Sequence, residues 1–258
     1  MPTAITRAVS SSLGACELTW LPRREIDIAK AVAQHRTYEQ TLRELGATVI
    51  SLAELPDHPD AVFVEDPAIV LDEVAVIMAM GVASRRGERE SLAAALGEFR
   101  PLIKMREPAL AEGGDVMRIG RDLFIGLSAR TNADGVRQLR EELAPFGYRV
   151  HGLELRDCLH LKSACCFIGD GAVLLNRAWL DWSLLREYRL IDVAADEPAG
   201  GNALRIGDTV LMPDAFPKTA AILRKQGFLT RTLDLSELLK AESGVTCSSL
   251  IFDTHVDH

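Results

Sequence analysis

The sequence predicts an α/β protein in which one structural unit is repeated. The unit is an apolar strand, a turn that contains Gly or Asp, a second apolar strand, a polar loop and an amphipathic helix. Its turns fall at Asp72, Gly120, Gly169 and Gly207, at intervals of roughly 40 to 50 residues, a period typical of repeat arrays. Such an array is either open, like a solenoid, or closed, like a propeller.

The elements follow in order along the chain. An apolar run at 5–9 predicts the first strand, and apolar spacing over 28–45 predicts the first helix. The units expected next are 68–78 with a helix at 88–96, 115–126 with a helix at 134–143, 165–175 with a helix at 180–188, and 203–212 with a helix at 217–227. A last strand at 249–252 completes the first unit, and closing the ring in this way removes exposed sheet edges. We expect a single domain over residues 1–258, because no low-complexity linker divides the chain, with a polar tail over about 253–258.

The composition indicates a cytoplasmic protein with a large core. Apolar residues make up 48% of the 258 residues, and the formal charge of −8 disfavours nucleic-acid binding, which needs a basic face. Five cysteines without a Cys-x-x-Cys pair, and an N-terminus that lacks the blocks of a signal peptide, favour a reduced compartment. No apolar run approaches the ~18 residues of a membrane span. We therefore expect neither a membrane nor a nucleic-acid partner.

Cys247 is the first candidate for chemistry. It lies in the run Ser243-Gly244-Val245-Thr246-Cys247-Ser248-Ser249, whose small polar residues bury a thiol poorly and whose Gly lets a ligand come close. A reactive thiol needs a base and a polar surround, and His160 and Glu112 are candidates for these roles. The simpler interpretation is a lone structural cysteine, because single-cysteine motifs often mislead.

Two motifs carry the acid and base groups. Leu159-His160-Leu161-Lys162 alternates apolar and polar residues, which predicts a strand with His160 and Lys162 on one face. Glu112-Gly113-Gly114-Asp115 is either a turn in which Asp115 bonds the backbone, or a point where the backbone passes close to a ligand that Glu112 reaches. Cys158 and His160 lack a second pair of ligands, so no structural zinc is expected.

Carboxylates and arginines are expected around the same axis. Glu65 and Asp66 end an apolar strand, with Asp60 just before it, and form either a solvated strand end or a clamp for a cation. On a strand these two neighbours point to opposite faces. Arg85 and Arg130 lie in equivalent loops of two units, which places them near a central site. No Gly-x-Gly-x-x-Gly or phosphate-loop pattern occurs, so no nucleotide cofactor is predicted.

Six motifs in this order resemble the dimethylarginine dimethylaminohydrolase family of the guanidine-modifying, or pentein, superfamily. They are Phe63-Val64-Glu65-Asp66, Ser84-Arg85-Arg86, Glu112-Gly113-Gly114-Asp115, Ser128-Ala129-Arg130-Thr131-Asn132, Leu159-His160-Leu161-Lys162-Ser163 and Thr246-Cys247-Ser248. The likeness runs nearly end to end. It implies a five-bladed αβ propeller with pseudo-fivefold symmetry, which agrees with the closed form of the repeat.

The resemblance implies a hydrolase that converts methylated arginine and water to citrulline and dimethylamine or methylamine, without a cofactor or a metal ion. Cys247 would attack the guanidinium carbon. His160 would protonate the leaving amine and then activate water, and Glu112 would orient His160. Because carboxylates raise the pKa of a nearby thiol and a bound guanidinium offsets this, we hypothesise that the substrate itself promotes thiolate formation.

The resemblance also implies the substrate contacts. Asp66, with Glu65 nearby, would hold the guanidinium, and the planar guanidinium groups of Arg85 and Arg130 would bind the substrate carboxylate. Leu18 would belong to a lid over the site, Asp60 would contact the amino group of the substrate, and Ala241 would contribute a backbone contact.

Lys162 favours a methylated substrate within that superfamily. Arginine deiminases and amidinotransferases usually carry an Asp at this position, which grips an unmethylated guanidinium, so a Lys leaves room for N-methyl groups. The alternatives are an enzyme that acts on another guanidine or ureido compound, and a non-catalytic pentein that serves as a binding module. The oligomeric state stays open, with a homodimer as one alternative.

Overall fold

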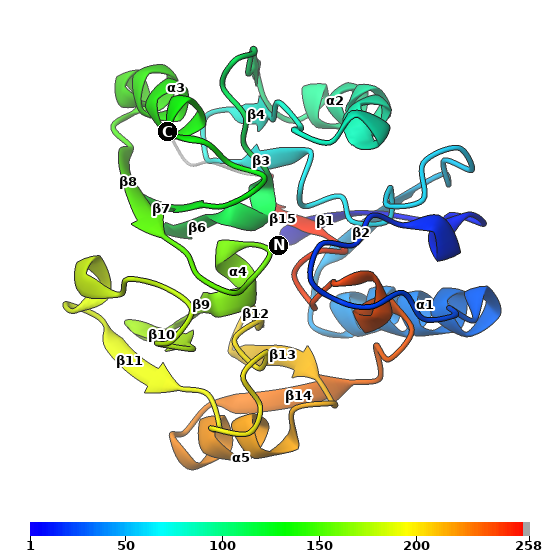
Figure 1. The fold of residues 1–258 in the computed structure, drawn as a ribbon, viewed down its shortest axis with the longest axis vertical. Helices are drawn as coiled ribbons and strands as arrows, with labels where there is room; N and C mark the ends of the chain where they lie inside the picture. The colour runs from blue at the N-terminus through cyan, green and yellow to red at the C-terminus, as the bar shows by residue number, and fades with distance from the viewer. Residues whose placement is uncertain (255–258) are drawn as a thin grey trace.

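Five three-stranded sheets form a closed ring around a central axis (Figure 1). The computed structural model describes residues 1–254 of the chain. The sheets, each from the inner to the outer strand, are β15 (Leu250–Asp253), β1 (Pro2–Arg7) and β2 (Thr48–Leu52); β3 (Ala68–Val70), β4 (Ala75–Ile77) and β5 (Leu102–Lys104); β6 (Val116–Ile119), β7 (Asp122–Leu127) and β8 (Arg149–Glu154); β9 (Cys165–Gly169), β10 (Ala172–Leu175) and β11 (Arg189–Asp192); and β12 (Leu204–Ile206), β13 (Thr209–Pro213) and β14 (Leu229–Leu233). This confirms the predicted five-bladed αβ propeller.

Each sheet combines an antiparallel and a parallel pair of strands. In the third sheet, β6 and β7 pair in antiparallel register from Val116 opposite Ile125 to Ile119 opposite Asp122. The turn between them contains Gly120 at a φ of 61°, a left-handed conformation that favours glycine. β8 then pairs with β7 in parallel, which requires a crossover connection. The predicted hairpin turns are thus confirmed, and the parallel outer strand of each unit was not predicted.

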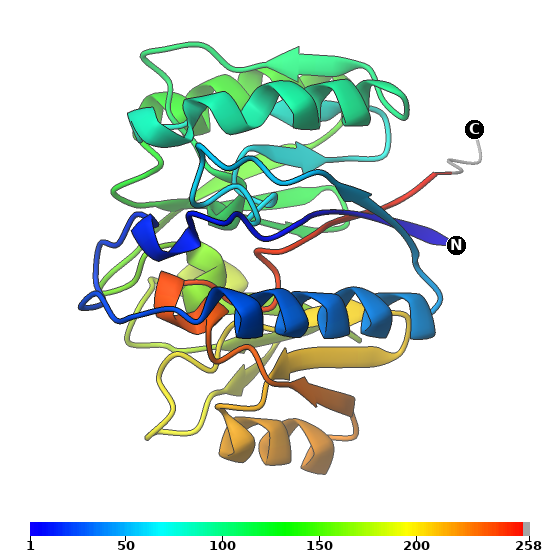
Figure 2. The same cartoon turned by 90° about the vertical axis from the view of Figure 1, so that its right-hand side faces the viewer.

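The two ends of the chain close the first sheet. β15 pairs with β1 in antiparallel register, with Ala4 opposite Ile251, as the sequence predicted. Both strands reach one face of the ring, and the loop over 8–27 lies at the opposite face (Figure 2). Chain closure therefore carries residue Cys247, just before β15, into the centre of the molecule.

Helices cover the outside of four sheets. They are α1 (Ile28–Glu44), α2 (Arg89–Gly97), α3 (Ala133–Leu143) and α5 (Pro217–Lys225), close to the predicted ranges. On α3 the i, i+4 pair Leu139 and Leu143 is fully buried, and burying a leucine side chain contributes about 1.5–3 kcal/mol. The helix predicted over 180–188 is wrong: only a short 3₁₀ turn, Ser183–Leu185, forms there, and Trp179 and Trp182 pack as loop residues against the core.

Three local predictions are also wrong. His160 and Lys162 do not share a strand, because His160 precedes the one-turn helix α4 (Leu161–Ala164). Residues 61–67 form consecutive turns and not an apolar strand, so Glu65 and Asp66 are not constrained to opposite faces. Cys247 lies in the turn before β15 and does not begin that strand.

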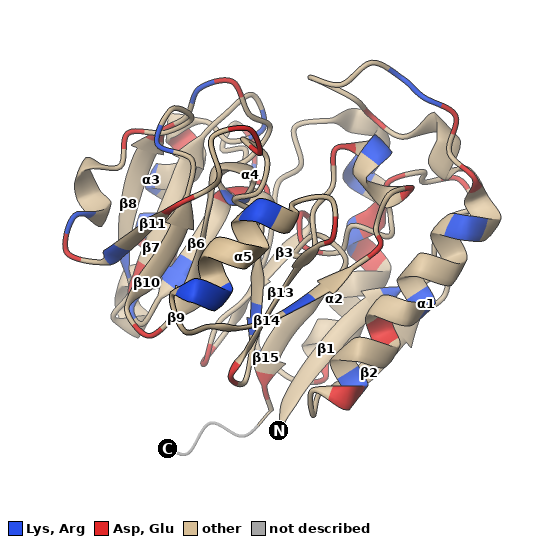
Figure 3. Cartoon of the chain, turned by 90° about the horizontal axis from the view of Figure 1, so that it is seen from below, with Lys and Arg blue, Asp and Glu red and all other residues tan. Residues whose placement is uncertain are grey.

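Acidic and basic positions are interspersed along the backbone in the view of Figure 3. Among residues 1–254, no helix has the length and apolar character needed to cross a membrane.

Candidate active site

A narrow cavity of about 20 Å³ lies inside the ring, and it is lined by seven of the ten predicted site residues. These seven are Asp60, Asp66, Arg85, Arg130, His160, Ala241 and Cys247. The other lining residues, which the sequence analysis did not single out as site residues, are Glu17, Phe63, Leu159, Glu242 and Ser243. The cavity has room for about one water molecule.

Cys247 is held in the turn that precedes β15. Its carbonyl accepts a hydrogen bond from Glu65 N–H at 3.1 Å, and Gly244 N–H donates to its Sγ at 3.2 Å. Burial raises the pKa of the Cys247 thiol, and the carboxylates of Glu65 and Asp66 raise it further. In the free protein the sulfur is therefore held as a neutral thiol at neutral pH.

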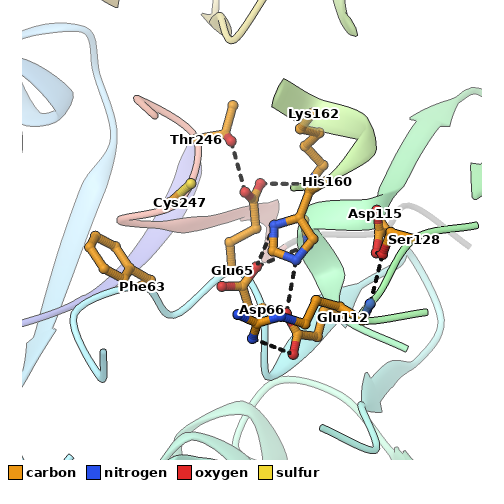
Figure 4. Close-up of polar contacts among 12 residues, drawn as sticks. Phe63, Glu65, Asp66, Glu112, Asp115, Ser128, His160, Lys162, Thr246 and Cys247 are labelled. Atoms are coloured by element: carbon orange, nitrogen blue, oxygen red, sulfur yellow. Dashed lines mark hydrogen bonds and ion pairs between the residues drawn. The ribbon is translucent and has the colours of Figure 1, made fainter. Parts of the chain in front are cut away.

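In the view of Figure 4, His160 lies on one side of Glu65 and Asp66, and Phe63 and Cys247 lie on the other. Its Nε2 hydrogen-bonds Glu112 Oε2 at 2.8 Å, and its Nδ1 lies 3.8 Å from Asp66 Oδ1. Burial by itself lowers the pKa of His160, but the carboxylates of Asp115, Asp66 and Glu112 outweigh this and raise the pKa to about 9. His160 is thus a buried imidazolium with a proton available for transfer.

Asp115 fixes the backbone beside His160. It is fully buried, and its Oδ1 accepts from Leu161 N–H at 2.9 Å. Its Oδ2 accepts from the hydroxyls of Ser128 and Thr131, each at 2.6 Å. Asp115 was expected only as a turn residue that bonds the backbone, and its place in the same motif as Glu112 was the available signal.

The two glycines of this motif allow the close approach of the catalytic groups. A Cβ on Gly114 would lie 2.6 Å from His160 Nδ1 and 2.7 Å from Asp66 Oδ1. A Cβ on Gly113 would lie 2.0 Å from the carbonyl oxygen of Glu65. Side chains at these positions would displace His160 and the 65–66 backbone, since real Cβ atoms do not come this close.

Asp66 is held by a buried arginine. Arg85 Nη1 donates to Asp66 Oδ2 at 2.7 Å, and its Nε and Nη2 donate to Glu88 at 3.0 and 2.9 Å. Burial would raise the pKa of Asp66, but Arg85 and His160 outweigh this and lower it. Asp66 therefore presents a carboxylate to the cavity, with Gly114 N–H donating to its Oδ1 at 3.2 Å.

The remaining predicted contacts lie around the mouth and behind the cavity. Arg130 Nη1 is 3.5 Å from Glu112 Oε1, and its Nη2 donates to Thr19 Oγ1 at 3.2 Å. Asp60 accepts from Glu17 N–H at 3.1 Å, and burial raises its pKa. Glu112, fully buried, and Leu18, which packs half-buried against the core near α1, do not line the cavity.

Glu65, the third predicted site residue that does not line the catalytic cavity, is held by Lys162 and Thr246. Its Oε1 pairs with Lys162 Nζ at 2.5 Å, and its Oε2 accepts from Thr246 Oγ1 at 2.7 Å. Burial by itself lowers the pKa of Lys162, but the Glu65 carboxylate outweighs this and raises it. On the far side of this ion pair the axis of the ring holds a second cavity of about 580 Å³, which is lined by Glu65, Lys162 and Thr246 among others.

One group of described residues has the spacing for a metal ion. Ligand atoms of Asp66, Glu112 and His160 lie within 4.8 Å of one another. Arg85 and Arg130 already place positive charge beside these carboxylates, and His160 Nε2 is occupied by Glu112. The group therefore fits a hydrogen-bonded acid–base network better than a metal site.

The closed ring of αβ units and the thiol–imidazole–carboxylate site define a hydrolase of the pentein fold that acts on guanidino groups. The chain belongs to the dimethylarginine dimethylaminohydrolase family. A family model described as N,N dimethylarginine dimethylhydrolase, eukaryotic, matches residues 15–175.

Relatives and solved structures resemble this chain over most of its length. The dimethylarginine dimethylaminohydrolase of Pseudomonas aeruginosa is 32% identical over 88% of this chain and 90% of its own, and that of Streptomyces coelicolor is 34% identical over 96% and 95%. A solved structure of the Pseudomonas enzyme, a cysteine-to-serine variant with citrulline, superposes with a TM-score of 0.92 at 30% identity, covering 97% of this chain and 98% of that one. The N-terminal domain of ArgZ, an arginine dihydrolase, superposes with a TM-score of 0.88 at 22% identity, which shows a shared fold.

Proposed function

We propose that this protein hydrolyses Nω-methylated arginine to citrulline and methylamine or dimethylamine. The observation that carries the proposal is the shared cavity in which the Cys247 thiol, the protonated His160 and the Asp66 carboxylate meet. Family membership supports the same activity, because two relatives are named dimethylarginine dimethylaminohydrolase and the structure of one was solved with citrulline bound.

In the first half-reaction the bound substrate cation promotes loss of the Cys247 thiol proton to solvent, and the resulting thiolate forms a bond to the guanidinium carbon. The C–N bond to the methylated nitrogen breaks, and His160 transfers its proton to the departing amine, which leaves as dimethylamine or methylamine. The product on the protein is an S-linked thiouronium cation. Glu112 stabilises the proton on His160 before transfer, because its carboxylate accepts the hydrogen bond from Nε2 at 2.8 Å.

In the second half-reaction water attacks the same carbon. His160, now neutral, takes one proton from that water. The C–S bond then breaks, and the second proton of the water passes to the departing sulfur, which returns the Cys247 thiol. The remaining oxygen gives the ureido group of citrulline. Because the same histidine serves as acid and then as base, its position must be fixed through both steps, and Asp115 and Glu112 supply this support.

Binding of the substrate cation supports thiolate formation. In the free site the pKa of Cys247 is raised by burial and by the carboxylates of Glu65 and Asp66. A guanidinium held by Asp66 adds a positive charge beside the sulfur and lowers the pKa at the moment of attack. The thiol is thus least reactive when no substrate is present.

The amino-acid end of the substrate lies toward the mouth of the cavity in this proposal. Arg130 supplies a partly buried guanidinium for its carboxylate, and Asp60 and the Ala241 backbone receive its ammonium group, with Leu18 on the lid. Arg85 retains the role implied by the resemblance as a second carboxylate ligand, although its three donors already contact Asp66 and Glu88.

A second candidate substrate is unmethylated arginine or another guanidine. Lys162 bears on this choice, because its ammonium group pairs with Glu65 at 2.5 Å and neutralises that carboxylate, whereas the Asp66 carboxylate lines the cavity. We propose that this arrangement leaves space for N-methyl groups.

Citrulline release from asymmetric dimethylarginine tests the proposal directly. The native protein is expected to form citrulline and an equal amount of dimethylamine, and Cys247→Ser is expected to form neither. Arginine and monomethylarginine are assayed alongside. Absence of citrulline from all three substrates would favour a non-catalytic binding module.

We also propose a reducing, cytoplasmic location. All five cysteines fall within residues 1–254, and none forms a disulfide there. Labelling of the native protein in cells with a thiol reagent, after denaturation, is expected to modify all five.

A further inference from the structure

The segment over 17–21, named the lid below, borders the catalytic cavity through Glu17. Glu17 lines the cavity, whose volume of about 20 Å³ is far below that of an arginine derivative. The segment forms no helix or strand, and Trp20 and Leu21 are 54% and 48% exposed. Leu18 packs half-buried against the core, and it is the one apolar side chain of residues 17–21 that is not exposed.

One side chain from across the chain holds the lid backbone. The carboxylate of Glu242 accepts hydrogen bonds from three consecutive amides, those of Thr19 at 2.8 Å, Trp20 and Leu21. Within residues 1–254 these three N–H groups have no other hydrogen-bond partner. Hydrogen bonds to a carboxylate are roughly twice as strong as those between neutral groups, and successive amides form a concave anion site.

The backbone of Glu242 is held in a conformation that is unfavourable for its residue type. Its φ of 56° and ψ of 25° lie in the left-handed region at the end of the 3₁₀ helix Leu238–Ala241, where glycine is favoured. A non-glycine residue is disfavoured in this conformation. In this left-handed conformation the carboxylate reaches the lid backbone. Glu242 also lines the catalytic cavity, as does Ser243.

The lid also contacts residues assigned to the substrate. Glu17 N–H donates to Asp60 Oδ2 at 3.1 Å, and Arg130 Nη2 donates to Thr19 Oγ1 at 3.2 Å. Glu242 itself belongs to the loop that carries Gly244, whose N–H contacts the Cys247 sulfur. Lid, substrate ligands and nucleophile are therefore joined in one set of contacts.

We propose that Glu242 is the latch of the catalytic lid, a positioning residue that holds residues 19–21 over the substrate. Opening exchanges three carboxylate–amide hydrogen bonds for hydrogen bonds to water, and reclosure after substrate entry restores them. The part of the inference that concerns substrate rests on the proposed function, whereas the latch itself does not.

Hydrogen exchange of the lid amides separates the two parts. The full-length protein is compared with Glu242→Gly, which removes the carboxylate and also relieves the left-handed strain, and with Glu242→Gln, which keeps a neutral acceptor. We expect the amides of residues 19–21 to exchange at least about tenfold faster in the glycine variant, with the glutamine variant intermediate. Glu141→Ala, at an exposed position on α3, serves as the control and is expected to match the native protein.

Stability and kinetics complete the test. Urea unfolding checks that Glu242→Gly still folds, and this variant is expected to show a raised KM for dimethylarginine with a smaller change in kcat. Equal exchange rates in the native and glycine variants would overturn the latch. Faster exchange with an unchanged KM would overturn its role in holding substrate, and an inactive native protein with a protected lid would sink the proposed function alone.

Discussion

The Nε2 atom of His160 lies 2.8 Å from Oε2 of Glu112, a carboxylate that is fully buried behind it. A buried carboxylate in this position stabilises the charged imidazole and fixes the direction of its ring. It also leaves Nδ1 on the side of Asp66, at 3.8 Å. The pair therefore determines both the charge of the acid group and its orientation in the cavity.

Glu112→Gln is expected to lower kcat about 100-fold, because it removes the charge that holds the proton on His160. The pKa of His160 should fall from about 9, so the alkaline limb of the kcat profile should move to lower pH. Citrulline release between pH 6 and pH 10, on the order of ten pH values, measures both effects. Glu141→Gln on the outer face of α3 is the matched control, and an unchanged pH profile in Glu112→Gln would contradict the role assigned to this carboxylate.

Asp115→Asn is expected to destabilise the fold by about 2 kcal/mol or more, because three buried hydrogen bonds converge on this carboxylate. The variant should also lose activity, because Asp115 anchors Leu161, the residue next to His160, by accepting a hydrogen bond from its N–H. Urea unfolding measures the first effect. Asp208→Asn, at a side chain that is 90% exposed, should change the free energy of unfolding by less than about 0.5 kcal/mol. Equal stability of the two variants would refute the prediction.

The charge on His160 links stability to pH. Its folded pKa of about 9 lies above the unfolded value of about 6.5, so its contribution is complete below pH ~6.5 and is lost as the pH rises through about 9. The difference in unfolding free energy between the native protein and His160→Gln should therefore shrink by about 3 kcal/mol over this range. Denaturant titrations at several pH values measure it, and a constant difference would show that His160 is neutral in the folded state.

Cys247 is expected to ionise at much lower pH when a guanidinium-like cation occupies the site. In the free protein, burial and the carboxylates of Glu65 and Asp66 keep its pKa raised. Ultraviolet titration of the thiolate with and without an amidine analogue of arginine measures the change in this pKa. The same titration of Cys247→Ser gives the background absorbance of the other four cysteines, which is subtracted. The same pKa in both titrations would rule out activation by the substrate.

The sequence predicted the hairpins and most helices because their signals are local. Turn glycines such as Gly120 and Gly207, both at positive φ, mark the junction of two apolar runs, and Leu139 with Leu143 marks the buried face of a helix. The outer strands were missed because they are short and half-exposed, as in Leu102–Lys104, so they lack alternation. Their pairing depends on the neighbouring strand and not on their own residues.

Cys247, His160 and its partner Glu112 could be predicted from motifs, whereas the roles of Asp115 and Glu242 could not. The alternation around His160 resembled a strand, but Asp115 captures Leu161 N–H and the chain turns into α4 instead. The contact between Glu242 and the lid joins residues that are more than 200 positions apart, and no spacing rule connects them. The contacts of Asp115 and Glu242 join segments that are distant in the sequence, so they form only in the folded ring.

The most direct test of the central claim is mass spectrometry of native protein that is acid-quenched during turnover of asymmetric dimethylarginine. The account predicts a mass increase equal to dimethylarginine minus dimethylamine, located on the peptide that contains Cys247 and absent from Cys247→Ser. Formation of citrulline by native protein without any such adduct, or an adduct on one of the other four cysteines, would contradict attack by Cys247 on the guanidinium carbon.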